Sequence, residues 1–116
     1  MADLTRKQAD DMVSRGVSLA GVNFVGAKLA GAKLAGANLA GANLAGANLI
    51  RANLAGANLK GARLSGAHLI NANLAGADFT EADLSGANLE GANFEGVNLE
   101  GAILKRTMMP DGRQHE

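Results

Sequence analysis

Apolar residues recur along this chain with a period of five. Leu or Phe stands at every fifth position from Leu19 to Leu104, eighteen times without a gap. Ala or Val stands two residues before each of them, from Val17 to Ala102. Gly stands two residues after in fourteen of the eighteen units, and the other four units have Arg51, Asn71, Glu81 and Arg106 there. The repeated unit is therefore A-(N/x)-L-x-G, and residues 17–106 consist of nothing else.

A period of five fits neither regular element. Successive Leu residues would lie about 140° apart around an α-helix and would alternate between the two faces of a flat strand. Within one extended unit, Ala and Leu share a face, so the chain must bend once per unit to keep both inside. Gly after Leu permits such a bend, because it tolerates positive φ. Bends of roughly a right angle, four to a circuit, predict a square solenoid.

The tandem A-N-L-x-G unit resembles the pentapeptide repeat proteins, and the resemblance covers residues 17–106. It implies an all-β fold, a right-handed quadrilateral parallel β-helix with Leu/Phe and Ala/Val inside. Four units per coil would make about four and a half coils of the eighteen units. The four corners without Gly leave open whether every corner needs that residue and whether the turn type changes there.

The two ends differ from the repeat and divide the chain into three parts. Thr5 and Gln8 have capping-box spacing, and Gly16 is placed as a helix stop, so we expect residues 1–16 to form a cap with a short helix over residues 5–15. Residues 17–106 form the β-helix, and residues 107–116 form a turn and tail. Met108 and Met109 are expected to cover the last coil as a candidate end contact, and residues 113–116 are expected to fray.

Outward positions are where function would lie in such a rod. Asn residues twenty apart should stack, and we expect a ladder of amides satisfied between neighbouring coils. Ile50 and Ile70 also stack, next to the non-Gly corners Arg51 and Asn71. One interpretation is that the two Ile are β-branched residues that fill a strand. Alternatively, the four residues form a small apolar contact patch with a polar rim, a candidate protein contact.

Charge is balanced overall but segregated along the chain, which has eleven basic and eleven acidic residues. The charged side chains of residues 17–69 are all basic, and those of residues 70–104 are all acidic. The acidic surface comprises Asp78, Glu81, Asp83, Glu90, Glu95 and Glu100. Such charges either keep the rod solvated or support self-association or a bipolar partner.

Several chemistries are excluded by composition and motif. The chain has no Cys, no P-loop and no G-x-S-x-G or G-x-G-x-x-G motif, and Leu and Ala should fill the interior. We therefore predict no enzyme, no catalytic or metal site, no cofactor and no small-molecule substrate. Zero net charge argues against a nucleic-acid partner, and no apolar run is long enough for a membrane span. The first residues show no secretory signal, which favours a cytoplasmic location.

Three functions remain open. The first is a non-enzymatic structural solenoid that serves as a protein–protein interaction module, or that associates with itself. The second follows from the resemblance, since some pentapeptide repeat proteins imitate DNA and bind DNA gyrase; this chain departs from them in its basic first coils and neutral net charge. The third is a consensus-like or designed scaffold without a native ligand, because residues 36–49 are nearly perfect repeats.

Overall fold

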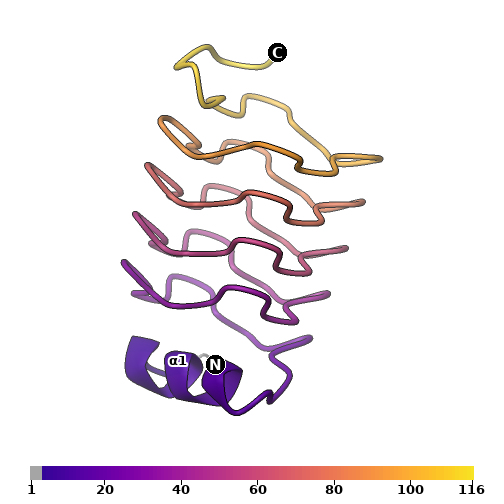
Figure 1. Ribbon diagram of the computed structural model, residues 1–116. Coiled ribbons are helices and arrows are strands. Elements are labelled where there is room, and N and C mark those ends of the chain that lie inside the picture. The colour runs from indigo at the N-terminus through magenta and orange to yellow at the C-terminus, as the bar shows by residue number, and fades with distance from the viewer. Residues whose placement is uncertain (1–3) are drawn as a thin grey trace.

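The structure is a computed structural model that describes residues 4–116 (Figure 1). It begins with one α-helix, α1 (Arg6–Ser14), whose capping box is complete. The Thr5 hydroxyl accepts from the Gln8 N–H at 3.1 Å, and the Thr5 N–H donates to Gln8 Oε1 at 2.8 Å. The helix predicted from this spacing is therefore present, and Gly16 follows it with a φ of 73°.

After α1 the chain winds into stacked, four-sided loops (Figure 1). From Asn23 to Asn88, the second residue of each unit makes a parallel bridge with the residue twenty positions further on, as in Asn38↔Asn58. These bridges are isolated pairs, because each side of the square is too short for an extended strand. The described chain measures 37 × 26 × 23 Å along its principal axes.

Three of the five backbone N–H groups in each unit hold neighbouring coils together. In the unit 57–61, the second residue donates to the coil below, and the third and fifth donate to the coil above. The bonds are Asn58 to Ala37 (2.9 Å), Leu59 to Asp78 (2.8 Å) and Gly61 to Thr80 (2.9 Å). Because the same pattern repeats along the rod, each coil is stabilised mainly by its two neighbours.

The first N–H of each unit closes the preceding corner. Ala57, for example, donates to the Leu54 carbonyl at 3.0 Å across a turn whose third residue has positive φ. This is the geometry of a type II turn, which favours Gly at that position. The repeat glycines have φ values of 65–73°. The four corners without Gly have φ of 61° at Arg51 and 59° at Asn71, Glu81 and Arg106, so the turn is kept and the residue is strained.

In most units the remaining N–H is satisfied by the Asn, Asp or Ser two residues earlier. The units with Lys28, Lys33, Arg63, His68 or Ile103 at that position lack such an acceptor. Lys60 N–H donates to Asn58 Oδ1 at 3.0 Å, and Ala75 N–H donates to Asn73 Oδ1 at 3.1 Å. This is an Asx turn within one unit. The stacking of the Asn residues is confirmed, but the expected amide bonds between coils are wrong, because the oxygens are used locally.

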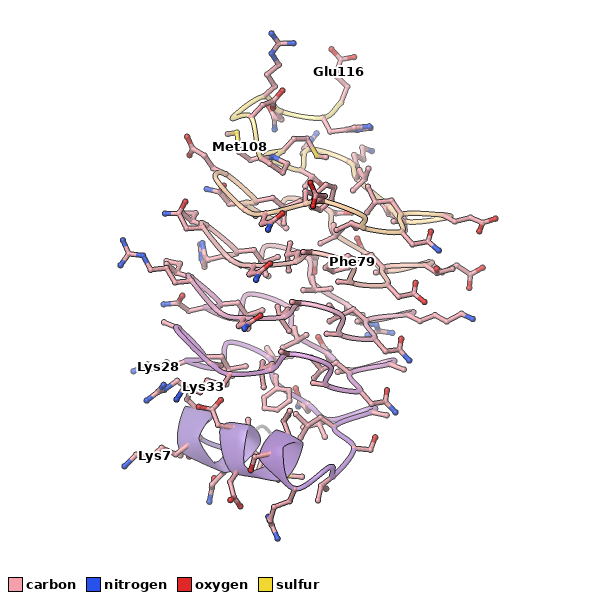
Figure 2. All side chains as sticks on the ribbon, viewed as in Figure 1. Lys7, Lys28, Lys33, Phe79, Met108 and Glu116 are labelled. Carbon is pink, nitrogen blue, oxygen red and sulfur yellow. The ribbon has the colours of Figure 1, made fainter. Side chains whose placement is uncertain are left out.

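The core is a column of Leu, Phe and Ala along the axis. From Leu19 to Leu89 every central residue is at most 1% exposed, and Phe79 lies inside the rod (Figure 2). The predicted inward positions are confirmed over this stretch. Val17 is 41% exposed, because it lies in the first coil at the N-terminal end of the rod. Phe94, Leu99 and Leu104, near the other end, are only partly buried.

The tail continues the repeat before folding back. Thr107 takes the inward Ala position and is fully buried, and its hydroxyl donates to the Leu84 carbonyl at 2.6 Å. Met108 then bridges Asn88 in parallel and Gln114 in antiparallel. The expected fraying of residues 113–116 is wrong, because Met109 N–H donates to Arg113 at 2.8 Å and His115 N–H donates to Thr107 at 2.7 Å.

Candidate interaction surfaces

One corner of the rod brings together the four residues of the candidate protein contact. Arg51 N–H donates to the Ile70 carbonyl at 3.0 Å, which stacks the second coil's corner directly on the third. Ile50 and Ile70 are half-buried, whereas Arg51 and Asn71 are exposed. We call these four residues the Ile corner. It presents a narrow apolar edge with two polar side chains beside it.

The Ile corner also holds two of the four strained backbone positions. Arg51 and Asn71 both have positive φ, a conformation that costs most L-residues about 1–2 kcal/mol and costs Asn less. The Asn71 side chain reaches over the same corner of the next coil, where Gly91 lies. A Cβ on Gly91 would overlap Asn71 Oδ1. Backbone strain at stacked surface positions is typical of sites under functional constraint, although it does not identify the function.

The acidic residues surround the rod rather than forming one stripe. Asp78 and Asp83 lie on adjacent faces, as the bridges Asn58↔Asp78 and Arg63↔Asp83 show. Glu90, Glu95 and Glu100 follow at three successive corners, five residues apart. A continuous negative track along one side is therefore not built by these residues.

Two of the carboxylates are tied to hydroxyl groups. The Thr80 hydroxyl donates to Asp78 Oδ1 at 2.5 Å, and the Ser85 hydroxyl donates to Asp83 Oδ1 at 2.6 Å. These bonds, followed by the backbone N–H bonds of the same residues, lower the pKa of both carboxyl groups. Both side chains therefore stay ionised at neutral pH and serve as charged caps, which is unsuited to general acid catalysis.

Within the repeats, the first three coils carry five basic residues, and Lys105 and Arg106 add two more in the last coil. Lys28 and Lys33 lie near α1, at the end opposite Met108 and Glu116 (Figure 2). Among residues 4–116 the ion pairs are all at the ends. They are Arg6–Asp10, Arg15–Asp11 and Arg113–Asp111. The charges between residues 17 and 106 therefore have no ion-pair partner within the described chain.

The candidate end contact is partly covered by the chain itself. Met109 occupies a core position next to buried residues, and the backbone of Met108 pairs with Gln114. Both Met side chains are half-buried. Sequence reasoning missed the extra unit that begins at Thr107, although its position five residues after Ala102 was a usable signal.

Residues 4–116 contain no group of His, Asp or Glu side chains able to hold a metal ion. No helix in this part is long and apolar enough to span a bilayer. The hollows in the surface lie beside α1 and are lined by residues such as Val13, Lys33 and Ala35.

The chain belongs to the pentapeptide repeat family. The family model for pentapeptide repeats matches residues 15–46, 27–66 and 67–106, which together cover the whole repeat region. Members of this family are structural repeat proteins that fold as right-handed quadrilateral β-helices, which is the fold class of this chain. No match is found among curated proteins.

Solved structures of the same family resemble this one. A pentapeptide repeat protein from the thylakoid lumen of Arabidopsis thaliana is 30% identical, with a TM-score of 0.82 over 98% of this chain and 76% of that one. A pentapeptide repeat protein of the cyanobacterium Cyanothece 51142 is 34% identical, with a TM-score of 0.51 over 81% of this chain and 63% of that one. A plasmid-mediated fluoroquinolone resistance protein is 20% identical, with a TM-score of 0.28 over 74% of this chain and 59% of that one.

Proposed function

We propose that this protein is a non-enzymatic interaction module that binds a protein partner through the Ile corner. The observation that carries the proposal is the pair of stacked, strained corners at Arg51 and Asn71, beside half-buried Ile50 and Ile70. Gly would remove the strain at both positions, so another property of these side chains offsets its cost. A contact with a partner supplies such a property.

The filled interior supports a binding role over a catalytic one. Leu, Phe and Ala occupy the axis, and the two carboxylates with lowered pKa are ionised caps. A rod of this kind offers flat faces and edges, which suit contacts with macromolecules rather than enclosure of a small substrate. A cytoplasmic location stays a prediction, and the Arabidopsis neighbour comes from a thylakoid lumen.

The DNA-mimic alternative receives less support. A duplex presents phosphates continuously along its length. Here the acidic residues encircle the later coils, and Lys60 and Arg63 lie in the coil beneath Asp78 and Asp83. The third alternative, a scaffold without a ligand, is addressed by the experiment below.

We further propose that both ends are capped, so that residues 17–106 stand as about four and a half coils. Asp10 of α1 accepts from the Lys33 N–H at 2.7 Å and takes the place of a carbonyl from a coil below. The hairpin of Met109 and Arg113 covers one side of the opposite end. Covered edges reduce end-to-end aggregation of a β-helix.

The Ile corner is tested by photo-crosslinking in cells that express the protein naturally. A benzophenone side chain replaces Ile50 or Ile70, and in matched controls it replaces Ala55 or Ala75, which lie in the same coils at the next corner. We expect a discrete cross-linked protein from positions 50 and 70 only. Adding Arg51→Gly and Asn71→Gly should reduce its yield several-fold.

Equal cross-linking from positions 50 and 55 would show that the Ile corner is not the contact. The absence of any product at all four positions would favour the scaffold without a ligand. Circular dichroism of each variant shows whether the fold is intact, so that a loss of product is assigned to the surface.

A further inference from the structure

A second face of the rod carries a charge pattern that the Ile corner does not involve. It consists of the stacked segments 22–26, 42–46, 62–66, 82–86 and 102–106, and we call it the R63–D83 face. Its second-position residues run Asn23, Asn43, Arg63, Asp83 and Ile103 from one end to the other. Its remaining outward residues in the second to fourth coils are Ala, Ser or Gly, so the face is flat there, and Lys105 and Arg106 project from its fifth coil.

Two large apolar side chains on this face are strongly exposed. Ile103 is 51% exposed and Val25 is 50% exposed, and Val17 is the third exposed large apolar residue of the described chain. An Ile at the second position cannot accept the hydrogen bond that the Oδ1 of Asn or Asp accepts in other units from the backbone N–H two residues later. Its presence there is therefore unexplained by the needs of the coil.

Opposite charges occupy adjacent coils on and beside this face. Arg63 lies in the third coil directly beneath Asp83 in the fourth. On the corner that leads into the face, Lys60 belongs to the third coil and Glu81 to the fourth, and Gly61 N–H donates to Thr80 to stack them. None of these four side chains forms an ion pair within residues 4–116.

We propose that two copies of this chain pair side by side and antiparallel through the R63–D83 face. The two-fold axis lies in the interface, perpendicular to the rod axis and level with the gap between the third and fourth coils. It therefore sets the third coil of one copy against the fourth coil of the other. Arg63 then faces the partner copy's Asp83, and Lys60 faces its Glu81. The symmetry repeats both contacts, which gives four ion pairs between the copies.

The same axis places Lys105 and Arg106 of the fifth coil opposite the uncharged Ala45 and Gly46 of the partner copy, and it leaves the first coil, with Val25, outside the contact. The fifth coil faces the second, so Ile103 covers the flat surface of Asn43 and Ala45 in the partner copy. No like charges oppose each other in this register. A shift by one coil would put Arg63 against itself, so charge selects a single alignment.

The size of the face predicts a weak and reversible dimer. In this register the second to fifth coils of each copy overlap, and four coils spaced by about 4.8 Å span about 19 Å. With a face about 20 Å wide, about 400 Å² per copy would be buried, which is small for specific association. Much of the attraction comes from ion pairs near the surface, so salt should weaken it.

A second copy fits the pattern better than an unrelated charged partner. A purely acidic ligand would be attracted by Lys60 and Arg63 but repelled by Glu81 and Asp83 one coil higher. On this face, positive charge in the third coil is followed by negative charge in the fourth. An antiparallel copy of the same face presents the two charges in the opposite order, so each charge meets its opposite. The chain itself supplies that pattern.

Sedimentation equilibrium of the full chain tests the pairing. The chain has no Trp or Tyr, so refractive-index detection is needed. At about 0.05 M salt we expect association, at increasing concentration, toward twice the monomer mass of 11.7 kDa. At about 0.5 M salt the dissociation constant of the dimer should be at least tenfold higher.

Charge exchange identifies the contact. Lys60→Glu should weaken the dimer at least tenfold, and Lys60→Glu combined with Glu81→Lys should restore it. Lys28→Glu, on another face, changes the net charge equally and should leave the dimer unaffected. Thermal unfolding of each variant shows that the fold is retained.

Three results would overturn the pairing. The wild type could stay monomeric up to about millimolar concentration, Lys28→Glu could weaken the dimer as much as Lys60→Glu, or the double exchange could fail to restore it. A dimer that survives salt and is lost on Arg51→Gly with Asn71→Gly would place self-association at the Ile corner instead. The first three results have no bearing on the cross-linking at Ile50 and Ile70, whereas the last would make a second copy of this chain the cross-linked partner there.

Discussion

Replacing Arg51 with Gly should stabilise this protein. Arg51 has a φ of 61°, a conformation that costs an L-residue about 1–2 kcal/mol and costs Gly nothing. Gly gives back about 0.5–1 kcal/mol through its greater freedom in the unfolded chain. The Arg51 side chain is exposed and forms no ion pair in the described chain, so little contact energy is lost. We expect a net gain of about 0.5–1 kcal/mol.

Urea unfolding followed by far-ultraviolet circular dichroism measures this gain. The midpoint should rise while the slope with urea stays constant, because the surface exposed on unfolding is unchanged. A gain of this size corresponds to an increase in Tm of about 2–5 °C. The repeat chain has neighbour-limited contacts, so agreement with a thermal scan is needed before a two-state free energy is assigned.

Two matched variants separate backbone strain from loss of the Arg side chain. Arg51→Ala removes the same side chain but keeps a Cβ at positive φ, so it should not stabilise. At the next corner, a Cβ added to Gly56 would have no atom within 4 Å, so Gly56→Ala introduces no steric overlap. Because position 56 has positive φ, this change should lower the free energy of unfolding by about 0.5–1 kcal/mol. The reasoning is refuted if Arg51→Ala stabilises as much as Arg51→Gly, or if Arg51→Gly destabilises.

Four further changes probe the same architecture, each measured by urea unfolding. Asn58→Ala should cost about 1 kcal/mol by uncapping the Lys60 N–H, whereas Asn58→Asp should be nearly neutral. Thr107→Val should cost about 1 kcal/mol, because it removes the buried bond to the Leu84 carbonyl at similar volume.

Gly91→Ala should cost more than Gly56→Ala, because its Cβ would overlap Asn71 Oδ1, and Asn71→Gly should remove the difference. Asp78 and Asp83 have pKa values below 3.8, so their stabilisation is present above that pH and is lost as pH falls through the lowered values. Asp78→Asn with Asp83→Asn should therefore flatten the acid limb of the stability profile. An unchanged acid limb would contradict the predicted role of Asp78 and Asp83. Equal costs for Gly91→Ala and Gly56→Ala would contradict the predicted overlap with Asn71.

The fold followed from spacing because the interior permits little variation. Each inward position touches the same position in the coils above and below, so only Ala or Val and Leu or Phe fit in their columns. Leu54, at 0% exposure, and the half-buried Ile50 were separated correctly by counting in fives. Counting also placed Asn38 under Asn58, because four units make one circuit.

Hydrogen bonding could not be predicted in the same way. A stacked Asn can bond to the coil above or to its own turn, and the sequence is identical in both cases. The structure selects the turn, because the neighbouring N–H groups already bond between coils and the Lys60 N–H is left over. The four non-Gly corners were similarly ambiguous, since only the φ of Arg51 or Glu81 in the structure shows that the turn is unchanged.

The tail was misjudged for a related reason. Thr107, Met108 and Met109 preserve the spacing of the repeat but none of its typical residues, so a pattern of residue types ends one unit before the coil does. Thr107 is accepted inside because its hydroxyl finds the Leu84 carbonyl, which is an acceptor that no sequence pattern announces.

The surface obeys a different rule from the core, and this is why function is harder to predict than fold. The inward columns are fixed by packing, so their residues carry information about the rod alone. The second, fourth and fifth positions are restrained only by the Asx bond and the corner, so departures from Asn, Ala and Gly there are free to serve contacts. Departures twenty residues apart become neighbours in space, as Ile50 and Ile70 do on one corner and Arg63 and Asp83 do on another face. In this chain the residues that break the repeat, rather than those that keep it, therefore define the surfaces to test.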